Sequence, residues 1–167
     1  MVRGLEAGDI PASLELKEAV ASEGRRIGAE APIDREGDSR RWRESLADDR
    51  AGSFVAVDDS GGIIGNIGIE LHRFGVAEVG MWVAHGWRGR GVGSALLTAA
   101  VEWARAAGAH KVALQHWPTN QAAVGLYEKF GFVEEGRLRR HYRRRDGELW
   151  TAVVRGLVLD EEAPGDP

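Results

Sequence analysis

The sequence predicts an α+β fold in which helices flank a mixed sheet of about seven strands. First, the stretch 78–107 begins as an apolar strand, breaks at a glycine- and arginine-rich turn and continues as an amphipathic helix. Second, Asp58-Asp59-Ser60-Gly61 and Asp146-Gly147 each separate two strand-like runs, as hairpin turns do. Third, a length of 167 residues with 43% hydrophobic residues is typical of one globular domain.

The first fifty residues predict a short strand and two helices. The strand covers 2–5, and Asp9 then caps a helix that runs to about residue 24. A shorter helix is predicted over 38–47, inside a segment, 25–52, that is dense in charge.

The middle of the chain predicts a hairpin, a central strand and the longest helix. Strands 53–57 and 62–71 flank the first hairpin turn, and the central strand ends at His85-Gly86. The helix carries one apolar face, with residues three or four apart at Val92, Leu96, Ala100, Trp103 and Ala107. Gly108 is its predicted C-cap.

Four further elements complete the chain: strand 111–117, helix 120–129 and strands 132–143 and 148–158. No linker or internal repeat divides them. The sequence therefore predicts a single domain over 1–159, followed by an acidic tail, 160–167, that is expected to be disordered.

The turn before the longest helix reads Arg88-Gly89-Arg90-Gly91-Val92-Gly93-Ser94 and predicts an anion site. Its glycines bare the backbone N–H groups at a helix start, where the helix dipole and two arginines add positive charge. A dinucleotide motif would place its third glycine one residue later, and a P-loop would end in Gly-Lys-Ser or Gly-Lys-Thr, which the chain lacks. A phosphate or pyrophosphate is the expected ligand.

Two motifs resemble one protein family. The spacing Arg88-x-x-Gly91-x-Gly93 is similar to the pyrophosphate motif of GNAT-type acyl-CoA N-acyltransferases. Residues 120–132 are similar to the family's second motif, N-x-x-A-x-x-L-Y-x-x-x-G-F. The resemblance covers about residues 53–159 and points to the phosphinothricin-acetyltransferase-like and ribosomal-alanine-acetyltransferase-like branches.

The resemblance implies a GNAT fold, whose two central strands part at one end, and acetyl-CoA as co-substrate. It implies that the backbone of Met81, Trp82 and Val83 pairs with the pantetheine arm and could hold the thioester oxygen. The turn 88–94 would bind the pyrophosphate, and Asn120 would contact the CoA arm besides capping its helix.

Acetyl transfer from a thioester to an amine needs a base and an acid. The chain has no cysteine, so we expect direct transfer in a ternary complex. The resemblance implies Tyr127 as the acid, and a packed core tyrosine is the alternative. Glu78, three residues before Met81, is the candidate base acting through a water, with Glu70 and His116 as alternatives.

The expected acceptor is a primary amine of a small or amino-acid-like molecule. Relatives that acetylate protein N-terminal alanine carry a glutamate twelve positions before the tyrosine, and Gln115 stands there in this chain. The alternatives are a protein N-terminus or lysine as acceptor, and a non-catalytic acyl-CoA-binding module. The resemblance also implies that 25–52 borders the acceptor, with a solvated connector as the alternative.

Composition argues against several other classes. Without cysteine there are no disulfides or thiolate ligands, and the five histidines lack metal-site spacing, so no metal is expected. The net charge of −4 argues mildly against general nucleic-acid binding. No apolar run approaches the ~20 residues of a membrane span, and no signal peptide is evident, so we expect a cytoplasmic protein. Homodimers are common in the resembled family.

One basic run remains: Arg137, Arg139, Arg140, Arg143, Arg144 and Arg145. It could bind an anionic acceptor group or RNA; the alternative is a solvated hairpin edge that charge protects from aggregation. Strand alternation predicts Arg137, Arg139 and His141 on one face, with Arg140 and Tyr142 on the other.

Overall fold

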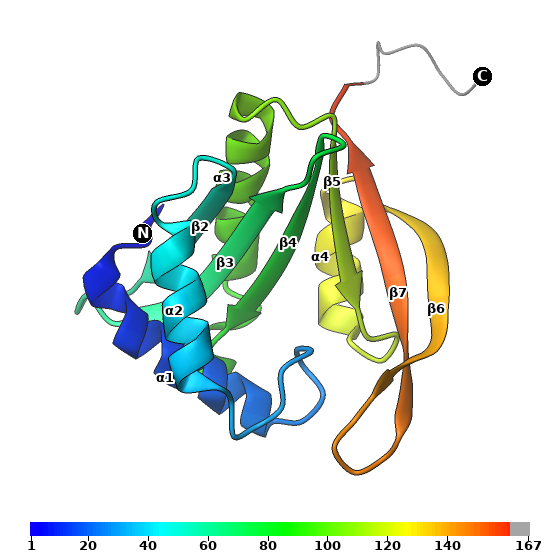
Figure 1. The fold of residues 1–167 in the computed structure, drawn as a ribbon, viewed down its shortest axis with the longest axis horizontal. Coiled ribbons are helices and arrows are strands. Elements are labelled where there is room, and N and C mark those ends of the chain that lie inside the picture. Colours follow the sequence, from blue (N-terminus) through cyan, green and yellow to red (C-terminus); the bar gives the residue numbers. More distant parts are fainter. Residues whose placement is uncertain (161–167) are drawn as a thin grey trace.

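The computed structural model describes residues 1–160, so the predicted tail lies, except for Asp160, outside the described residues. The elements follow the predicted order (Figure 1). The strands are β1 (Val2–Gly4), β2 (Ala51–Val57), β3 (Ile63–Leu71), β4 (Val76–Val83), β5 (Lys111–His116), β6 (Val133–Arg143) and β7 (Leu149–Val158). The helices are α1 (Ile10–Ser22), α2 (Arg35–Ser45), α3 (Val92–Ala106) and α4 (Gln121–Lys129), with 3₁₀ turns at Ala7–Asp9 and His85–Trp87.

The strands form one seven-stranded sheet in the order β1-β2-β3-β4-β5-β7-β6. All neighbours are antiparallel except β4 and β5, which are parallel. These two pair only where Val76–Val79 lie opposite Lys111–Leu114. Beyond that point β4 continues to Val83 and β5 to His116 without pairing to each other. The predicted α+β fold with a splayed central pair is confirmed.

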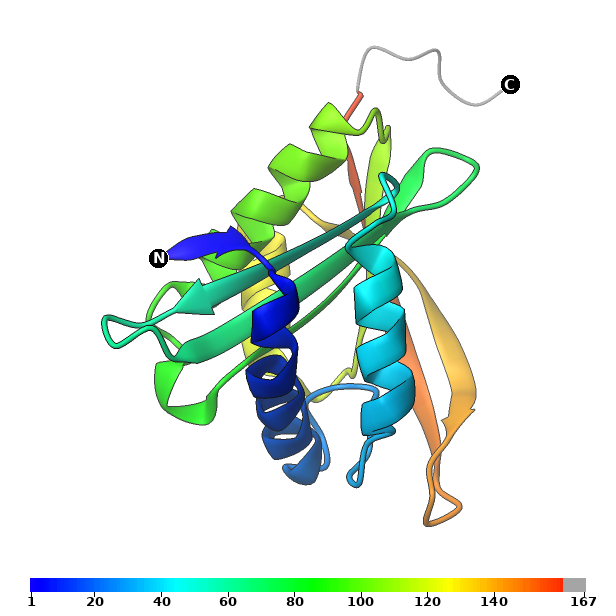
Figure 2. The same cartoon turned by 60° about the vertical axis from the view of Figure 1, so that its left-hand side comes forward.

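Helices cover both faces of the sheet (Figures 1 and 2). α1 and α2 lie on one face, and α3 and α4 on the other. The larger core lies under α3 and α4, where Leu96 and Leu97 are fully buried. A smaller core under α1 and α2 contains Leu14 and Val55. Most of β3 is buried, because both faces of this central strand are covered.

Two local predictions were wrong, for α2 and β6, and one was right only in part. α2 begins three residues early because Asp34 Oδ1 accepts the N–H of Gly37 at 2.9 Å and caps the helix there. Asp9 occupies the predicted N-cap position of α1, but its carboxylate pairs with Arg3 and makes no cap hydrogen bond. The predicted alternation along β6 fails because its pairing with β7 shifts between Leu138 and Tyr142.

Candidate active site

The splay between β4 and β5 opens a cavity of about 790 Å³. β4 contributes 79–83 to its wall, and residues 115–117 lie at and just after the end of β5. The rest of the wall comes from α1, the loop after α1, the turn before α3, helix α4, Tyr142 of β6 and Ala152 of β7. Most of the predicted site residues meet here: Met81, Trp82, Val83, Arg88, Gly89, Gly91, Gly93, Ser94, Asn120 and Tyr127 all line the cavity. Arg90 and Val92 belong to the same turn but are not part of the cavity wall. The two motifs, distant in sequence, therefore form one site.

The turn 88–94 adopts a backbone suited to glycine. Gly89 and Gly91 have φ values of 72° and 86°, in the left-handed region. Ala95 donates an intrahelical bond to the Gly91 carbonyl at 3.0 Å. The N–H groups of 92–94 therefore precede the helical ladder and have no acceptor within α3. They form a donor cluster at the positive end of a fifteen-residue helix.

The two arginines of this turn are held differently. Arg88 donates from Nε to the Val83 carbonyl at 2.9 Å, and from Nη1 and Nη2 to the Glu23 carboxylate at 2.6 and 2.7 Å. This bidentate pair lowers the pKa of the Glu23 carboxyl, so the carboxylate stays charged. Arg90 instead lies over the Trp87 ring, 5.4 Å from its centroid. Arg88 thus joins the end of β4 to the end of α1.

Tyr127 lies on α4 and is 8% exposed. Its ring packs against His116 and Phe132, with centroids 5.8 Å away in both cases. Burial raises the pKa of its phenol to about 12, because the charged phenolate is poorly solvated there. The phenol is therefore protonated at neutral pH, and Tyr127 is part of the cavity wall.

His116 has both ring nitrogens engaged. Nδ1 lies 3.0 Å from the Trp117 carbonyl, which requires a hydrogen on Nδ1, and Nε2 then accepts the Nε–H of Arg155 at 3.0 Å. Burial lowers the pKa of His116, and the imidazole is neutral at pH 7. Because its one free lone pair already accepts a hydrogen bond, His116 is poorly placed to act as a base.

The two candidate carboxylates stand apart from this cavity. Glu70 and Glu78 are direct partners across β3 and β4 and line a separate depression beside His72. The Glu78 side chain is 60% exposed, with Oε2 3.4 Å from His72 Nε2. Strand alternation puts Glu78 on the face of β4 that carries Gly80 and Trp82, and these two residues do line the cavity. A proton reaching Glu78 from the cavity would have to pass through water.

Sequence reasoning missed a lysine in the cavity wall. The Nζ of Lys17 donates to Asp38 Oδ2 at 2.7 Å. It lies 5.8 and 5.7 Å from the ring centroids of Trp42 and Trp82, which stack on each other. Asp38 is 4% exposed and also pairs with Arg41. Lys17 is thus held against the stacked rings of Trp42 and Trp82 while it borders the cavity.

The charged side chains around the cavity are all basic: Lys17, Arg26, Arg88 and Lys129. Within residues 1–160, no aspartate or glutamate lines it. Such a lining attracts anionic ligands. The sequence carried a signal for Lys17, which stands three residues from both Leu14 and Val20 and so lies among the buried residues of α1.

The loop between α1 and α2 forms one wall of the cavity, through residues 26–29. Trp117 Nε1 donates to the Ile27 carbonyl at 3.2 Å, and Asn120 Nδ2 donates to the Arg26 carbonyl at 3.4 Å. Asn120 stands at the N-cap position of α4, but its side chain bonds this loop instead of the helix. The sequence allows either a solvated connector or a border of the acceptor site for this segment, and the structure places residues 26–29 in the cavity wall.

The cavity wall fits a long, thin ligand with phosphate groups. Gly80, Gly89, Gly91 and Gly125 line it, and a Cβ on any of them would meet no atom within 4 Å. Beyond Val79 the side of β4 that faces β5 has no strand partner, so its backbone groups are available to a ligand. The N–H groups at the start of α3 and the nearby basic side chains suit phosphates.

Comparison with known proteins identifies related sequences and folds. Residues 18–132 match the model of the acetyltransferase (GNAT) family. The L-amino acid N-acetyltransferase AaaT of Escherichia coli strain K12 is 34% identical over 127 residues, covering 70% of this chain and 75% of that protein. The L-methionine sulfoximine/L-methionine sulfone acetyltransferase of Pseudomonas aeruginosa is 28% identical over 142 residues, 82% of each chain.

Solved structures share the fold. The phosphinothricin acetyltransferase of Sinorhizobium meliloti, solved in complex with acetyl-CoA, superposes with a TM-score of 0.86 at 18% identity, covering 100% of this chain and 92% of that one. Across residues 1–160, the helices are too short or too polar to cross a bilayer.

Proposed function

The chain belongs to the acetyltransferase (GNAT) family, and we propose that it acetylates the primary amine of a small acceptor with an acidic group, such as an amino acid. It is an acetyl-CoA-dependent acyltransferase, and acetyl-CoA is its co-substrate. The amino acid acetyltransferases among its relatives support this acceptor class.

In this proposal acetyl-CoA, the acetyl donor, lies along the gap between β4 and β5. The N–H groups of 92–94, with Arg88 and Arg90, hold the pyrophosphate, and Asn120 contacts the CoA arm. The backbone of Met81–Val83 pairs with the pantetheine arm as a further strand would. An N–H donor at the thioester oxygen stabilises the charge that develops there, by about 3 kcal/mol for a well-placed donor.

Two protons move during transfer. The amine must be neutral to attack the thioester carbon, and the departing thiolate must gain a proton as the C–S bond breaks. We assign the second task to Tyr127, whose raised pKa keeps the phenol protonated. We assign the first to Glu78, working through water along the β4 face that it shares with Gly80 and Trp82.

The observation in the structure that carries the acceptor class is that the charged residues of the cavity lining are basic. Asp38 occupies one of the three hydrogens of the Lys17 ammonium, which leaves donors for an acceptor carboxylate. A polyamine would bring several positive charges against these cations without a carboxylate to pair with.

The test compares L-amino acids with their amides, which keep the amine and the side chain but lose the carboxylate. We expect kcat/KM, read as CoA release, to be about tenfold or more higher for the acids, a preference typical of a charge-assisted hydrogen bond. The double variant Lys17→Met/Asp38→Asn should reduce this preference to within about threefold, and it removes both charges of the pair together.

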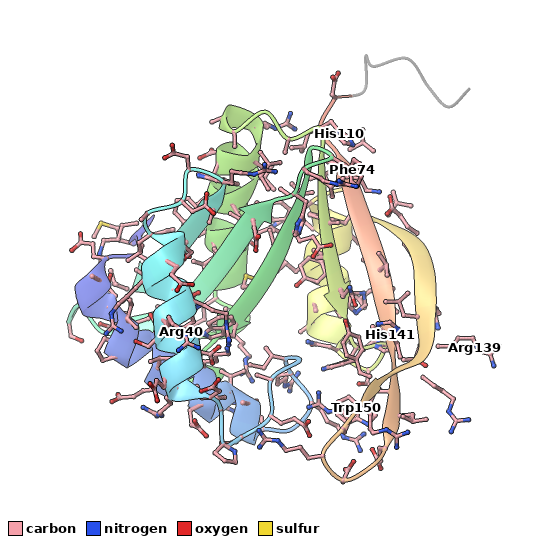
Figure 3. All side chains as sticks on the ribbon, viewed as in Figure 1. Arg40, Phe74, His110, Arg139, His141 and Trp150 are labelled. Carbon is pink, nitrogen blue, oxygen red and sulfur yellow. The ribbon has the colours of Figure 1, made fainter. Side chains whose placement is uncertain are left out.

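Arg40→Met, on the exposed side of α2 (Figure 3), is the matched control and should keep the preference. Equal rates for acids and amides, or faster turnover of spermidine, would overturn the acceptor class. Binding of acetyl-CoA without CoA release on any amine in the panel would favour a non-catalytic acyl-CoA-binding module.

A further inference from the structure

We propose that Arg144 is a positioning residue that holds the α1–α2 loop as the acceptor-side wall of the cavity. The inference rests on the proposed function and assigns a role to the arginine run that sequence reasoning left open. Arg144 does not line the cavity itself. It would act through the backbone of the loop and through two tryptophans that pack around it.

Arg144 is buried, unlike the other arginines of its run. It lies just before the β6–β7 hairpin turn and is only 6% exposed, whereas Arg139 and Arg143 are exposed. A buried guanidinium needs partners that replace water. Arg144 Nη1 donates to the Gly28 carbonyl at 2.7 Å, and Nε lies 3.5 Å from Glu30 Oε1. Both partners belong to the α1–α2 loop.

Aromatic rings complete the pocket around this cation. The guanidinium carbon of Arg144 lies 4.4 Å from the Trp150 ring centroid and 5.4 Å from that of Trp117. The two rings meet edge to face at 5.0 Å. Trp150 is labelled in Figure 3 near the base of the hairpin. A planar guanidinium can stack on a ring and donate in its own plane at once, which an ammonium cannot do.

The same cluster reaches the cavity. Trp117 lines the cavity and donates from Nε1 to Ile27, the residue before Gly28. Arg144 therefore binds the Gly28 carbonyl, while Trp117, whose ring packs against Arg144, binds the carbonyl of the preceding residue, Ile27. Residues 26–29 and Lys17 line the same cavity. Because the proposed function assigns the acceptor carboxylate to Lys17, the position of this loop would set the room left for the acceptor.

A second arginine reinforces the loop farther along. Arg145 donates from Nη1 to the Ala31 carbonyl at 2.7 Å and from Nη2 to the Pro32 carbonyl at 2.8 Å. Its backbone N–H lies 3.2 Å from Glu30 Oε1. Arg145 is exposed, so water can replace these bonds at little cost, and the buried Arg144 carries the larger share.

The experiment compares Arg144→Lys and Arg144→Met with Arg139→Lys, the exposed control on β6 (Figure 3). Three quantities are measured: the KM values of acceptor and acetyl-CoA together with kcat, the rate of trypsin nicking after Arg25 and Arg26 followed by mass spectrometry, and Tm. We expect both Arg144 variants to raise the acceptor KM and the nicking rate about tenfold, the size typical of one lost charge-assisted hydrogen bond. The KM of acetyl-CoA should change less than the acceptor KM, because the loop reaches the proposed CoA arm only through the 3.4 Å bond from Asn120 to the Arg26 carbonyl. The value of kcat should stay within about twofold.

The conservative variant distinguishes a held loop from a general effect of charge. If Arg144→Lys keeps the wild-type acceptor KM and nicking rate, the planar guanidinium of Arg144 and its stacking on Trp150 have no role, and the inference fails. It also fails if both KM values and kcat change together in proportion to a fall in Tm, because that is the behaviour of a residue needed for stability alone. Trypsin nicking can be measured without an acceptor. If the Arg144 variants are nicked faster but the protein acetylates no amine, the proposed function fails, whereas the anchoring of the loop by Arg144 is supported.

Discussion

At the scale of single residues, the proposed chemistry depends on where two titratable groups lie. Tyr127 is buried in the cavity wall and its phenol has a pKa of about 12. Glu78 lies on an exposed part of β4, outside that wall. An acid that stays protonated suits proton donation to the departing thiolate, and a solvated carboxylate suits removal of the proton from the amine.

The prediction at this scale tests the two roles with separate variants. Tyr127→Phe should lower kcat about 10²-fold at every pH between 6 and 10, because the missing proton donor is protonated over that whole range. Glu78→Gln should lower kcat/KM about tenfold or more, because an amide cannot accept the proton of the amine. CoA release measured against pH checks both variants.

A Tyr127→Phe variant with wild-type kcat would make Tyr127 a packing residue. A Glu78→Gln variant that retains the wild-type kcat/KM would move the base to Glu70 or to water alone. Tm of each variant serves as the control for folding.

At the scale of elements, the turn before α3 and the end of α1 are joined by one ion pair. Arg88 donates hydrogen bonds from both Nη groups to the Glu23 carboxylate. The arginine that is expected to bind a pyrophosphate therefore already has an anionic partner within the chain. Arg88 also holds the last carbonyl of β4. An arriving pyrophosphate would have to share or displace the Glu23 carboxylate.

We therefore predict that Glu23→Gln strengthens CoA binding by about threefold to tenfold, because it removes a negative charge beside the phosphate site. Isothermal titration with CoA measures the change, and Glu15→Gln, an exposed acid of α1, is the control. The gain should shrink with added salt, which screens the charge. Weaker CoA binding in Glu23→Gln would mean that Glu23 orients Arg88 for the ligand instead of competing with it.

At the scale of the whole molecule, a buried arginine joins β5, β7 and α4. Arg155 donates to His116 Nε2 at 3.0 Å, to the Phe132 carbonyl at 3.3 Å and to Glu128 Oε1 at 3.2 Å. The contact with His116 requires a neutral imidazole, and burial lowers the pKa of that group. Protonation of His116 would place two positive charges side by side in the core.

This arrangement predicts a loss of stability in acid. The folded pKa of His116 lies below its unfolded value of about 6.5, so its contribution is present above pH ~6.5 and is lost as pH falls through the lower folded value. Tm should therefore fall more between pH 7 and pH 5 in the wild type than in His116→Gln, which cannot titrate. Calorimetry at the two pH values measures this difference, and equal falls in both proteins would contradict the prediction.

Much of the molecule could be predicted because its signals are local. Periodicity and turn residues predicted every strand and helix to within a few residues, and positive φ at Gly89 and Gly91 explains the glycine turn. The alternation of side chains predicted along β6 is broken by a bulge, which depends on how β6 pairs with β7. The start of α2 could not be placed at Asp34, because the surrounding segment is dense in charged residues and the cap gives no distinct pattern within it.

The α+β order of elements, the glycine- and arginine-rich turn and the family motifs could be read from the amino-acid sequence, because each depends on residues a few positions apart. The folded structure was needed to show that Glu78 lies outside the cavity, that Lys17 borders it and that Arg144 is buried. The last contact joins Arg144 to Gly28 across 116 positions of sequence. Spacing along the chain sets local backbone geometry, whereas the meeting of distant side chains depends on how the sheet and its loops pack, which no local pattern records.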